Sequence, residues 1–276
     1  MRYSHFIITR FNLRNNSPAW SRDKTGRTVL TDEWMDKRME LFMNFCMPSV
    51  INQSNKNFLW LIYFDETTDN GIRNIISELQ AKYQGFMHFF FADGYMDFLK
   101  RYGKDVLSFC DQGQDHVITT RLDNDDIIHK DFVKKIQESY ADQHFTTVNF
   151  MKILMFTPFN NNKLHIDYIF SNHFISLIEQ ISEKGIEGCY SKGDREWLDT
   201  ETIQITDKPY CIEIISETNL LNSFTGFPVL KKFRLSDFGL GDMVVKNRLS
   251  DPSNFKIWKM SWRKYLISKT LKKYRH

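Results

Sequence analysis

The sequence contains no long apolar run and few cysteines. No stretch approaches the ~18 consecutive apolar residues that a membrane-spanning helix needs, and the first residues enter a strand-like run without a signal-peptide pattern. The four cysteines, Cys46, Cys110, Cys189 and Cys211, are widely separated. This scatter predicts reduced core thiols and not a disulfide framework or a zinc site. We therefore expect a cytoplasmic protein.

Acidic residues are absent from the end of the chain. Residues 256–276 hold eight Lys or Arg and no Asp or Glu, so the rest of the chain carries 29 basic and 34 acidic side chains, a net charge of −5. As a helix, this tail would place four aromatic or apolar side chains in one sector of ~100°: Trp258, Trp262, Tyr265 and Leu266. A basic tail can be a solvated helix, a membrane-surface contact or a nucleic-acid contact.

Strands and helices alternate along the first half of the chain. Four apolar runs are predicted strands: residues 5–9, 58–64, 86–91 and 117–120. Three helices are predicted between them: one from the N-cap Asp32 to an end or kink near Pro48, one over 71–83, and one over 96–102 that Gly103 stops. This alternation predicts a doubly wound α/β sheet with flanking helices and right-handed crossovers.

The second half is less regular. A helix is predicted over 132–140, strands over 146–150 and 164–170, and either a helix or a strand over 174–181. The connection between the two strands contains the run Pro158-Phe159-Asn160-Asn161-Asn162.

The strand over 117–120 leads into an acidic stretch, Asp123-Asn124-Asp125-Asp126. Three carboxylates within four residues repel one another, so they need open solvent or a cation. Ligands of open α/β sheets bind beyond the carboxyl ends of the strands. Asp123 and Asp125 project to the same side of an extended chain, and their oxygens suit Mg²⁺ or Mn²⁺ that also takes phosphate oxygens.

The acidic stretch has two further interpretations. A Ca²⁺ loop counted from Asp123 fails, because Ile128 takes the position of the required Gly and Lys134 that of the required Glu. An acidic turn that caps the next helix is the alternative for any Asp-x-Asp taken alone.

Several short segments carry a family resemblance. They are Ile8-Thr9-Arg10-Phe11-Asn12-Leu13-Arg14, Cys46-Met47-Pro48-Ser49 with Gln53, Phe58-Leu59-Trp60-Leu61, Thr120-Arg121-Leu122-Asp123-Asn124-Asp125-Asp126, and His129-Lys130-Asp131-Phe132-Val133. In this order they resemble the putative rhamnosyltransferase family of GT-A glycosyltransferases. The resemblance implies a GT-A-like mixed sheet over residues 1–255, with a nucleotide and metal half at about 1–142 and an acceptor half at about 143–255. Residues 256–276 would follow as a separate basic tail.

The resemblance also implies an activity. It is the metal-dependent transfer of a sugar, rhamnose by the family's label, from a nucleotide-diphosphate donor to a glycan or lipid-linked acceptor in surface polysaccharide synthesis. A divalent ion, Mn²⁺ or Mg²⁺, would neutralise the departing diphosphate as a Lewis acid. By the resemblance, Asp125 is the expected direct metal ligand, and Asp123 contacts the ribose or shares the metal. Asp126 is either part of this group or a helix cap.

Other candidate donor contacts lie at the ends of strands. By the resemblance, Thr9 and Asp65 lie where such enzymes contact the nucleotide base, although Asp65 can also be a turn residue. Arg10 and Arg121 either contact phosphate or pair with a nearby Asp. We expect these strand ends to meet in one cleft.

The second half departs from the family pattern. Many relatives have His-Gly-x-Asn where this chain has Ser216-Glu217-Thr218-Asn219, and that His can complete the metal site. Glu217 is therefore predicted to substitute as an oxygen ligand, or the metal is held from one side only.

Candidate general bases follow from a polar loop. Asp194 and Glu196 lie in this loop, and either could take the proton of the acceptor hydroxyl. The neighbouring Trp197 could stack on a sugar. The alternative is that both carboxylates are ordinary surface charges without a catalytic role. His116, His129 and His173 are interpreted as packing or capping residues.

Two competing functions remain. A nucleotidyltransferase also needs a metal beside a nucleotide, but no Gly-rich phosphate loop near the N-terminus supports it. A nucleic-acid-binding tail leaves the acidic stretch unexplained and conflicts with the body's net charge, so no nucleic-acid partner is expected.

The basic tail could also contact a membrane, because anionic lipid attracts basic residues at roughly 1 kcal/mol each. We therefore predict that the tail makes peripheral contact with the inner face of a membrane. The alternative is that the tail is a solvated helix.

Overall fold

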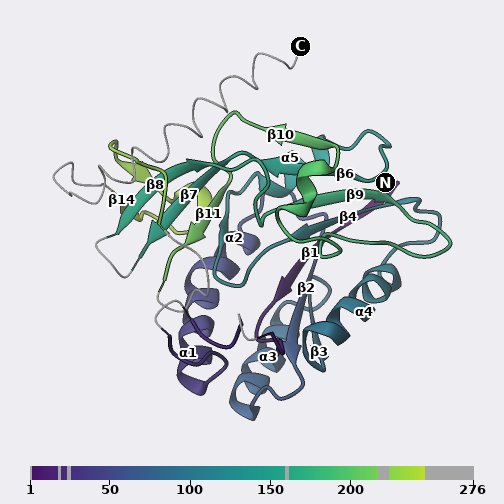
Figure 1. The fold of residues 1–276 in the computed structure, drawn as a ribbon, viewed down its shortest axis with the longest axis horizontal. Coiled ribbons are helices and arrows are strands. Elements are labelled where there is room, and N and C mark those ends of the chain that lie inside the picture. Colours follow the sequence, from purple (N-terminus) through teal and green to yellow (C-terminus); the bar gives the residue numbers. More distant parts are fainter. Residues whose placement is uncertain (1, 18–19, 24–25, 159–161, 217–223, 246–276) are drawn as a thin grey trace.

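The first half of the chain builds the parallel part of a sheet (Figure 1). The computed structural model describes residues 2–17, 20–23, 26–158, 162–216 and 224–245. Four parallel strands lie in the order β4-β1-β2-β3: β1 (Tyr3–Arg10), β2 (Leu59–Asp65), β3 (Met87–Ala92) and β4 (His116–Arg121). Their apolar runs are almost continuous because helices cover both faces.

Three further strands extend this sheet beyond β4. They are β9 (Ser176–Gln180), β6 (Thr146–Phe150) and β10 (Thr202–Ile205). Strand β9 is antiparallel to both β4 and β6, whereas β10 is parallel to β6. The seven-stranded sheet is therefore mixed, and the predicted α/β class with a mixed sheet is confirmed.

Helices cover both faces of the seven-stranded sheet. One face packs against α1 (Asp32–Leu41), α3 (Asn70–Lys82) and α5 (Phe132–Glu138), and the other packs against α4 (Gly94–Ser108). A π-helical turn over Phe42–Cys46 joins α1 to α2 (Met47–Ile51). Alternate residues of the strands divide between the faces: Ile7 packs on the α1 side, and Phe6 and Ile8 pack on the α4 side.

A second sheet lies beside the acidic stretch. Its strands run in the order β12-β8-β7-β11-β5: β5 (Ile127–Ile128), β7 (Lys152–Thr157), β8 (Lys163–Tyr168), β11 (Cys211–Ile214) and β12 (Phe227–Pro228). A short ribbon follows: β13 (Phe233–Arg234) and β14 (Val244–Val245). Two 3-10 turns lie over Glu196–Asp199 and Ser236–Phe238. Because β4 belongs to the first sheet and β5 to the second, residues 122–126 connect the two sheets.

Several predicted boundaries were wrong. Helix α4 continues through Gly103, because buried Phe98, Tyr102 and Val106 pack on both sides of it and outweigh the ~1 kcal/mol that glycine costs in a helix. The connection predicted between the strands at 146–150 and 164–170 contains strand β7. The N-cap of α1 is Thr31 and not Asp32, since the Thr31 side chain accepts from the Trp34 amide.

The structure also settles two assignments that the sequence leaves open. The segment predicted as a helix or a strand over 174–181 contains strand β9, and helical structure continues past Pro48, which occupies the first turn of α2.

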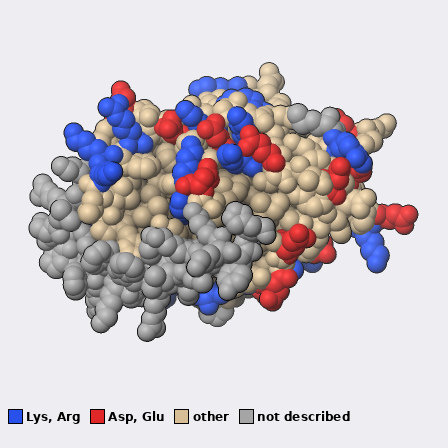
Figure 2. All heavy atoms as spheres, turned by 90° about the horizontal axis from the view of Figure 1, so that it is seen from above, with Lys and Arg blue, Asp and Glu red and all other residues tan. Residues whose placement is uncertain are grey.

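None of the helices within the described ranges is long and apolar enough to cross a membrane. On the face shown in Figure 2, acidic and basic side chains of the described residues lie interspersed. The tail at 256–276 and Glu217 lie outside the described residues.

Candidate functional site

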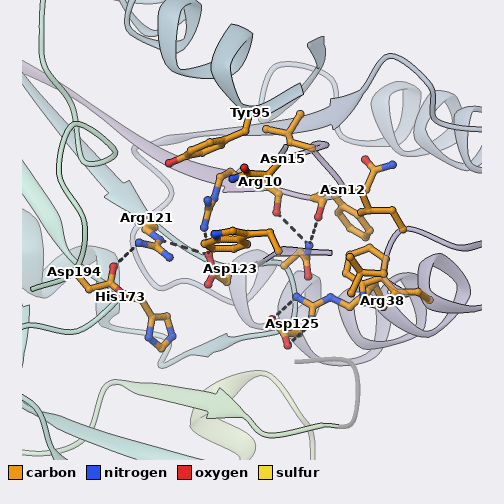
Figure 3. A pocket seen from close by; sticks show the side chains of 17 residues that line it. Arg10, Asn12, Asn15, Arg38, Tyr95, Arg121, Asp123, Asp125, His173 and Asp194 are labelled. Atoms are coloured by element: carbon orange, nitrogen blue, oxygen red, sulfur yellow. Dashed lines mark hydrogen bonds and ion pairs between the residues drawn. The ribbon is translucent and has the colours of Figure 1, made fainter. Parts of the chain in front are cut away.

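A pocket of about 210 Å³ lies at the carboxyl ends of β1 and β4, where the chain enters the acidic stretch. This is the edge of an open α/β sheet where ligands bind. Twelve of the side chains that line it come from distant parts of the chain (Figure 3): Arg10, Asn12, Asn15, Trp20, Trp34, Arg38, Tyr95, Arg121, Asp123, Asp125, His173 and Asp194.

Asp123 lies between two arginines. Its Oδ1 is 3.7 Å from Arg10 Nη2 and 3.5 Å from Arg121 Nε. Burial alone would raise the pKa of Asp123, but the charges of Arg121 and Arg10 outweigh it and hold that pKa well below its usual range. Arg121 also donates to Asp194, so this guanidinium links two carboxylates of the pocket (Figure 3).

Aromatic faces hold the same two arginines. The Arg10 guanidinium carbon lies 4.9 Å from the ring centre of Tyr190, 5.2 Å from Tyr95 and 5.8 Å from Trp20. That of Arg121 lies 5.3 Å from Tyr190. These contacts are within cation–π range. The buried Nε of Arg10 has no hydrogen-bond partner among the described residues, which leaves a donor available for an anionic ligand.

Asp125 is bound by Arg38. Arg38 Nη1 donates to Asp125 Oδ2 at 2.6 Å, and Nη2 donates to Oδ1 at 2.9 Å. The pair is almost fully buried, with side-chain exposures of 10% and 3%. The role of direct metal ligand predicted for Asp125 stays a prediction, since an ion would have to displace Arg38 from these oxygens.

Asp126 is bound by His173 and by the second sheet. His173 Nε2 lies 2.7 Å from Asp126 Oδ2, and the Ile214 amide of β11 donates to Asp126 Oδ1 at 3.0 Å. Burial alone would lower the pKa of His173, but Asp126 outweighs it and raises that pKa. Asp126 therefore does not cap a helix: its carboxylate holds the acidic stretch to β11.

One group of side chains has the donor types of a metal site. Ligand atoms of Asp123, Asp126 and His173 all lie within 4.8 Å of one another. Two carboxylates and one imidazole are oxygen and nitrogen donors, a set that fits Mn²⁺. The predicted ligand Asp123 belongs to this group, whereas the sequence indicated only a packing or capping role for His173.

Two predicted donor contacts are not among the side chains that line the pocket. Thr9 is fully buried, and its hydroxyl accepts from Trp60 Nε1 at 2.9 Å on the α1 side of the sheet. The buried Asp65 accepts from Arg14 N and Nε at 3.0 and 2.8 Å, and from Thr67 N and Oγ1 at 3.0 and 2.7 Å.

These hydrogen bonds determine the ionisation of Asp65. Burial raises its pKa, but donation from Arg14 and Thr67 outweighs burial and lowers that pKa. The carboxylate fixes the turn after β2 to the segment after β1. Contact with a nucleotide base remains a prediction for both Thr9 and Asp65.

The two candidate bases differ in position. Asp194 lines the pocket, and its side chain is 44% exposed. Glu196 is exposed and accepts from the Gly193 amide at 2.6 Å, so it fixes its own loop. The expectation that Trp197 stacks on a sugar was wrong, because this ring is 1% exposed and packs in the core on the α4 side.

Sequence reasoning missed several residues of the site. Arg38 lies on α1, 87 positions from its partner Asp125, and Tyr95 and Tyr190 become neighbours of Arg10 only in the folded chain. Glu213 of β11 does not line the pocket, but it is 5% exposed, and burial raises its pKa while the charge of nearby His173 lowers it. An acidic residue within an apolar strand is the signal that could have identified Glu213.

A known protein family matches the part of the chain that builds most of this pocket. The family model described as "Putative rhamnosyl transferase" matches residues 1–173. No curated protein matches the chain.

Three solved structures show a distant similarity to this chain. One is a putative nucleotide-diphospho-sugar transferase from Desulfovibrio desulfuricans G20, with 11% identity, coverage of 78% of this chain and 82% of that one, and a TM-score of 0.37. Another is residues 1–349 of TarS from S. aureus, with 13% identity, coverage of 76% of this chain and 60% of that one, and a TM-score of 0.42. The third is HddC from Yersinia pseudotuberculosis, with 15% identity, coverage of 76% of this chain and 93% of that one, and a TM-score of 0.37. Since the family model spans more than half of the chain, the protein belongs to the putative rhamnosyl transferase family and is a glycosyltransferase.

Proposed function

We propose that this glycosyltransferase binds a nucleotide-diphosphate sugar in the pocket at the ends of β1 and β4. The observation that carries the proposal is the convergence of Arg10 and Arg121 on Asp123. Both guanidinium groups are held by carboxylates and aromatic rings, and Arg10 keeps a buried donor without a partner among the described residues. Preorganised arginines recognise phosphate oxygens by charge-assisted hydrogen bonds.

The chain's own residues supply most of the chemistry. In the transfer, the bond between the anomeric carbon and the diphosphate oxygen breaks, and a bond to an acceptor oxygen forms. Arg10 and Arg121 stabilise the negative charge that develops on the leaving diphosphate. Asp123 orients both arginines and faces the ribose or a bound cation. Asp194 takes the proton of the acceptor hydroxyl, because it is the pocket carboxylate with the largest exposed fraction.

A divalent ion, Mn²⁺ or Mg²⁺, is part of the proposal. Asp123, Asp126 and His173 would hold it, and when bound it supplies positive charge beside the diphosphate. Asp125 is a ligand only in a state in which Arg38 has released it. Glu217 remains a proposed ligand that lies outside the described residues.

The sugar, acceptor and location are also proposals. The family's description points to rhamnose. The acceptor would be a glycan or a lipid-linked sugar of surface polysaccharide synthesis, and the basic tail at 256–276 would bring the enzyme to the inner face of a membrane.

A panel of nucleotide sugars tests the donor proposal. Each is titrated into the full chain by calorimetry, with Mn²⁺, with Mg²⁺ and with neither ion. We expect one nucleotide-diphosphate sugar to bind much more tightly than its free sugar. Absence of binding by every member, in all three conditions, would refute the proposed donor site.

A further inference from the structure

We infer that Arg38 is an internal cation that occupies Asp125 and keeps divalent ions away from it. The inference deepens the proposed function, and only its consequence for donor binding rests on that function. Arg38 is then a positioning residue for Asp125, and any ion bound in the pocket is held by side chains other than Asp125.

Each carboxylate of the acidic stretch has its own nitrogen partner from the chain. Asp123 faces Arg10 and Arg121, Asp125 faces Arg38, and Asp126 faces His173. Three neighbouring carboxylates would otherwise repel one another in a buried site. The fold therefore neutralises the stretch without needing an ion at every position.

The geometry of the Arg38–Asp125 pair favours permanent occupation of the Asp125 oxygens by the Arg38 guanidinium. Both terminal nitrogens of Arg38 donate to separate oxygens of Asp125, at 2.6 and 2.9 Å, which is the bidentate arrangement of a strong arginine–carboxylate pair (Figure 3). The guanidinium carbon also lies 5.4 Å from the ring centre of Trp34, one turn earlier on α1. Helix and ring thus hold Arg38 in place before any ligand binds.

The burial of the pair adds to this stability, because the Arg38 and Asp125 side chains are only 10% and 3% exposed. Removing one partner of a buried pair leaves an uncompensated charge, which proteins tolerate poorly. A divalent ion that bound Asp125 would create this state for Arg38 unless the guanidinium moved out of the pocket.

Binding of Mn²⁺ alone tests the inference without reference to turnover. Free Mn²⁺ is measured by electron paramagnetic resonance in titrations of the full chain and of three variants: Arg38→Met, Asp125→Asn and the double variant. Arg101→Met is the matched control, since Arg101 pairs with Asp105 at 3.2 Å outside the pocket. We expect Arg38→Met to bind Mn²⁺ at least tenfold more tightly than the wild type, because the Arg38 guanidinium no longer competes with the ion for Asp125. The double variant should lose this gain, and Asp125→Asn and the control should bind as the wild type does.

Two results would overturn the inference. One is unchanged Mn²⁺ affinity in folded Arg38→Met. The other is a loss of affinity of tenfold or more in Asp125→Asn that the double variant does not restore, which would make Asp125 a ligand despite Arg38. The second result decides the matter even where Arg38→Met does not fold. A chain that shows the expected Mn²⁺ pattern but binds no nucleotide sugar would refute the donor proposal and support the inference.

Discussion

Asp194 and Glu196 are two carboxylates of one loop that the structure separates by role. Asp194 reaches the pocket beside Arg121, whereas Glu196 accepts from the Gly193 amide. Asp194→Asn removes the proposed proton acceptor and should lower turnover by roughly 10²–10⁴-fold, the range typical of general base catalysis. Glu196→Gln, the matched control, should retain most activity.

The measurement is the steady-state rate of nucleoside diphosphate release in the presence of the acceptor. Asp194→Asn with a normal rate would remove Asp194 from the mechanism. A large loss in Glu196→Gln, with the fold intact by circular dichroism, would transfer the role to Glu196.

At the residue scale, sequence could identify the carboxylates but not their partners. Asp123, Asp125 and Asp126 are evident as an acidic stretch after an apolar run, and this pattern indicates a site. Their partners come from 87 positions away for Asp125 and 47 positions away for Asp126. Single arginines and histidines at such separations carry no local signal, so only the fold can bring them together.

At the element scale, one glycine tests how tightly the loop before Asp194 is packed. Gly188 has a φ of +74°, and a Cβ there would lie 2.6 Å from ring atoms of Tyr102 on α4. Gly113 has a similar φ of +88° with nothing within 4 Å. Gly113→Ala should therefore cost only the left-handed strain of about 1–2 kcal/mol, whereas Gly188→Ala should cost roughly 1–3 kcal/mol more through overpacking.

Urea unfolding of both variants and the wild type measures this difference in the free energy of unfolding. Equal losses in the two variants would contradict the close packing of Gly188 against α4. The Gly113 variant serves as the control for backbone strain alone.

Elements of the first half were predictable because each strand is a nearly continuous apolar run. Boundaries failed where tertiary packing outweighed local preference, as at Gly103 within α4. In the second half, β7 was missed because its run, from Lys152 to Thr157, follows β6 with only Met151 between them. Two strands of different sheets joined this closely leave no turn signal in the sequence.

At the scale of the whole molecule, the charge distribution predicts a role for the tail. Of its eight basic residues, four follow Ser268. At roughly 1 kcal/mol per basic residue near an anionic surface, a chain ending at Ser268 should bind anionic vesicles more weakly, by up to roughly 10³-fold at low salt. Co-sedimentation with vesicles of phosphatidylglycerol and phosphatidylcholine measures this, and equal binding by both chains, or none by either, would exclude the tail as an anchor.

The described part of the molecule is organised around the connection between its two larger sheets. The acidic stretch leaves β4 in the first sheet and enters β5 in the second, and Asp126 accepts from β11. The pocket therefore lies where both sheets contribute to the surroundings of one loop. Sequence could place the stretch at a strand end, but the second sheet and its contact with Asp126 depend on pairings between distant strands.

Arg121 and its neighbours are proposed to hold the donor diphosphate. The test is calorimetric titration of the nucleotide sugar selected by the panel into Arg121→Met and into Arg2→Met. Arg2 also pairs with two carboxylates, Asp115 and Asp142, but lies outside the pocket. Loss of a charge-assisted hydrogen bond should weaken binding by about 10–100-fold in Arg121→Met and leave Arg2→Met equal to the wild type. Equal affinity in both variants would refute the binding of the donor diphosphate by Arg121.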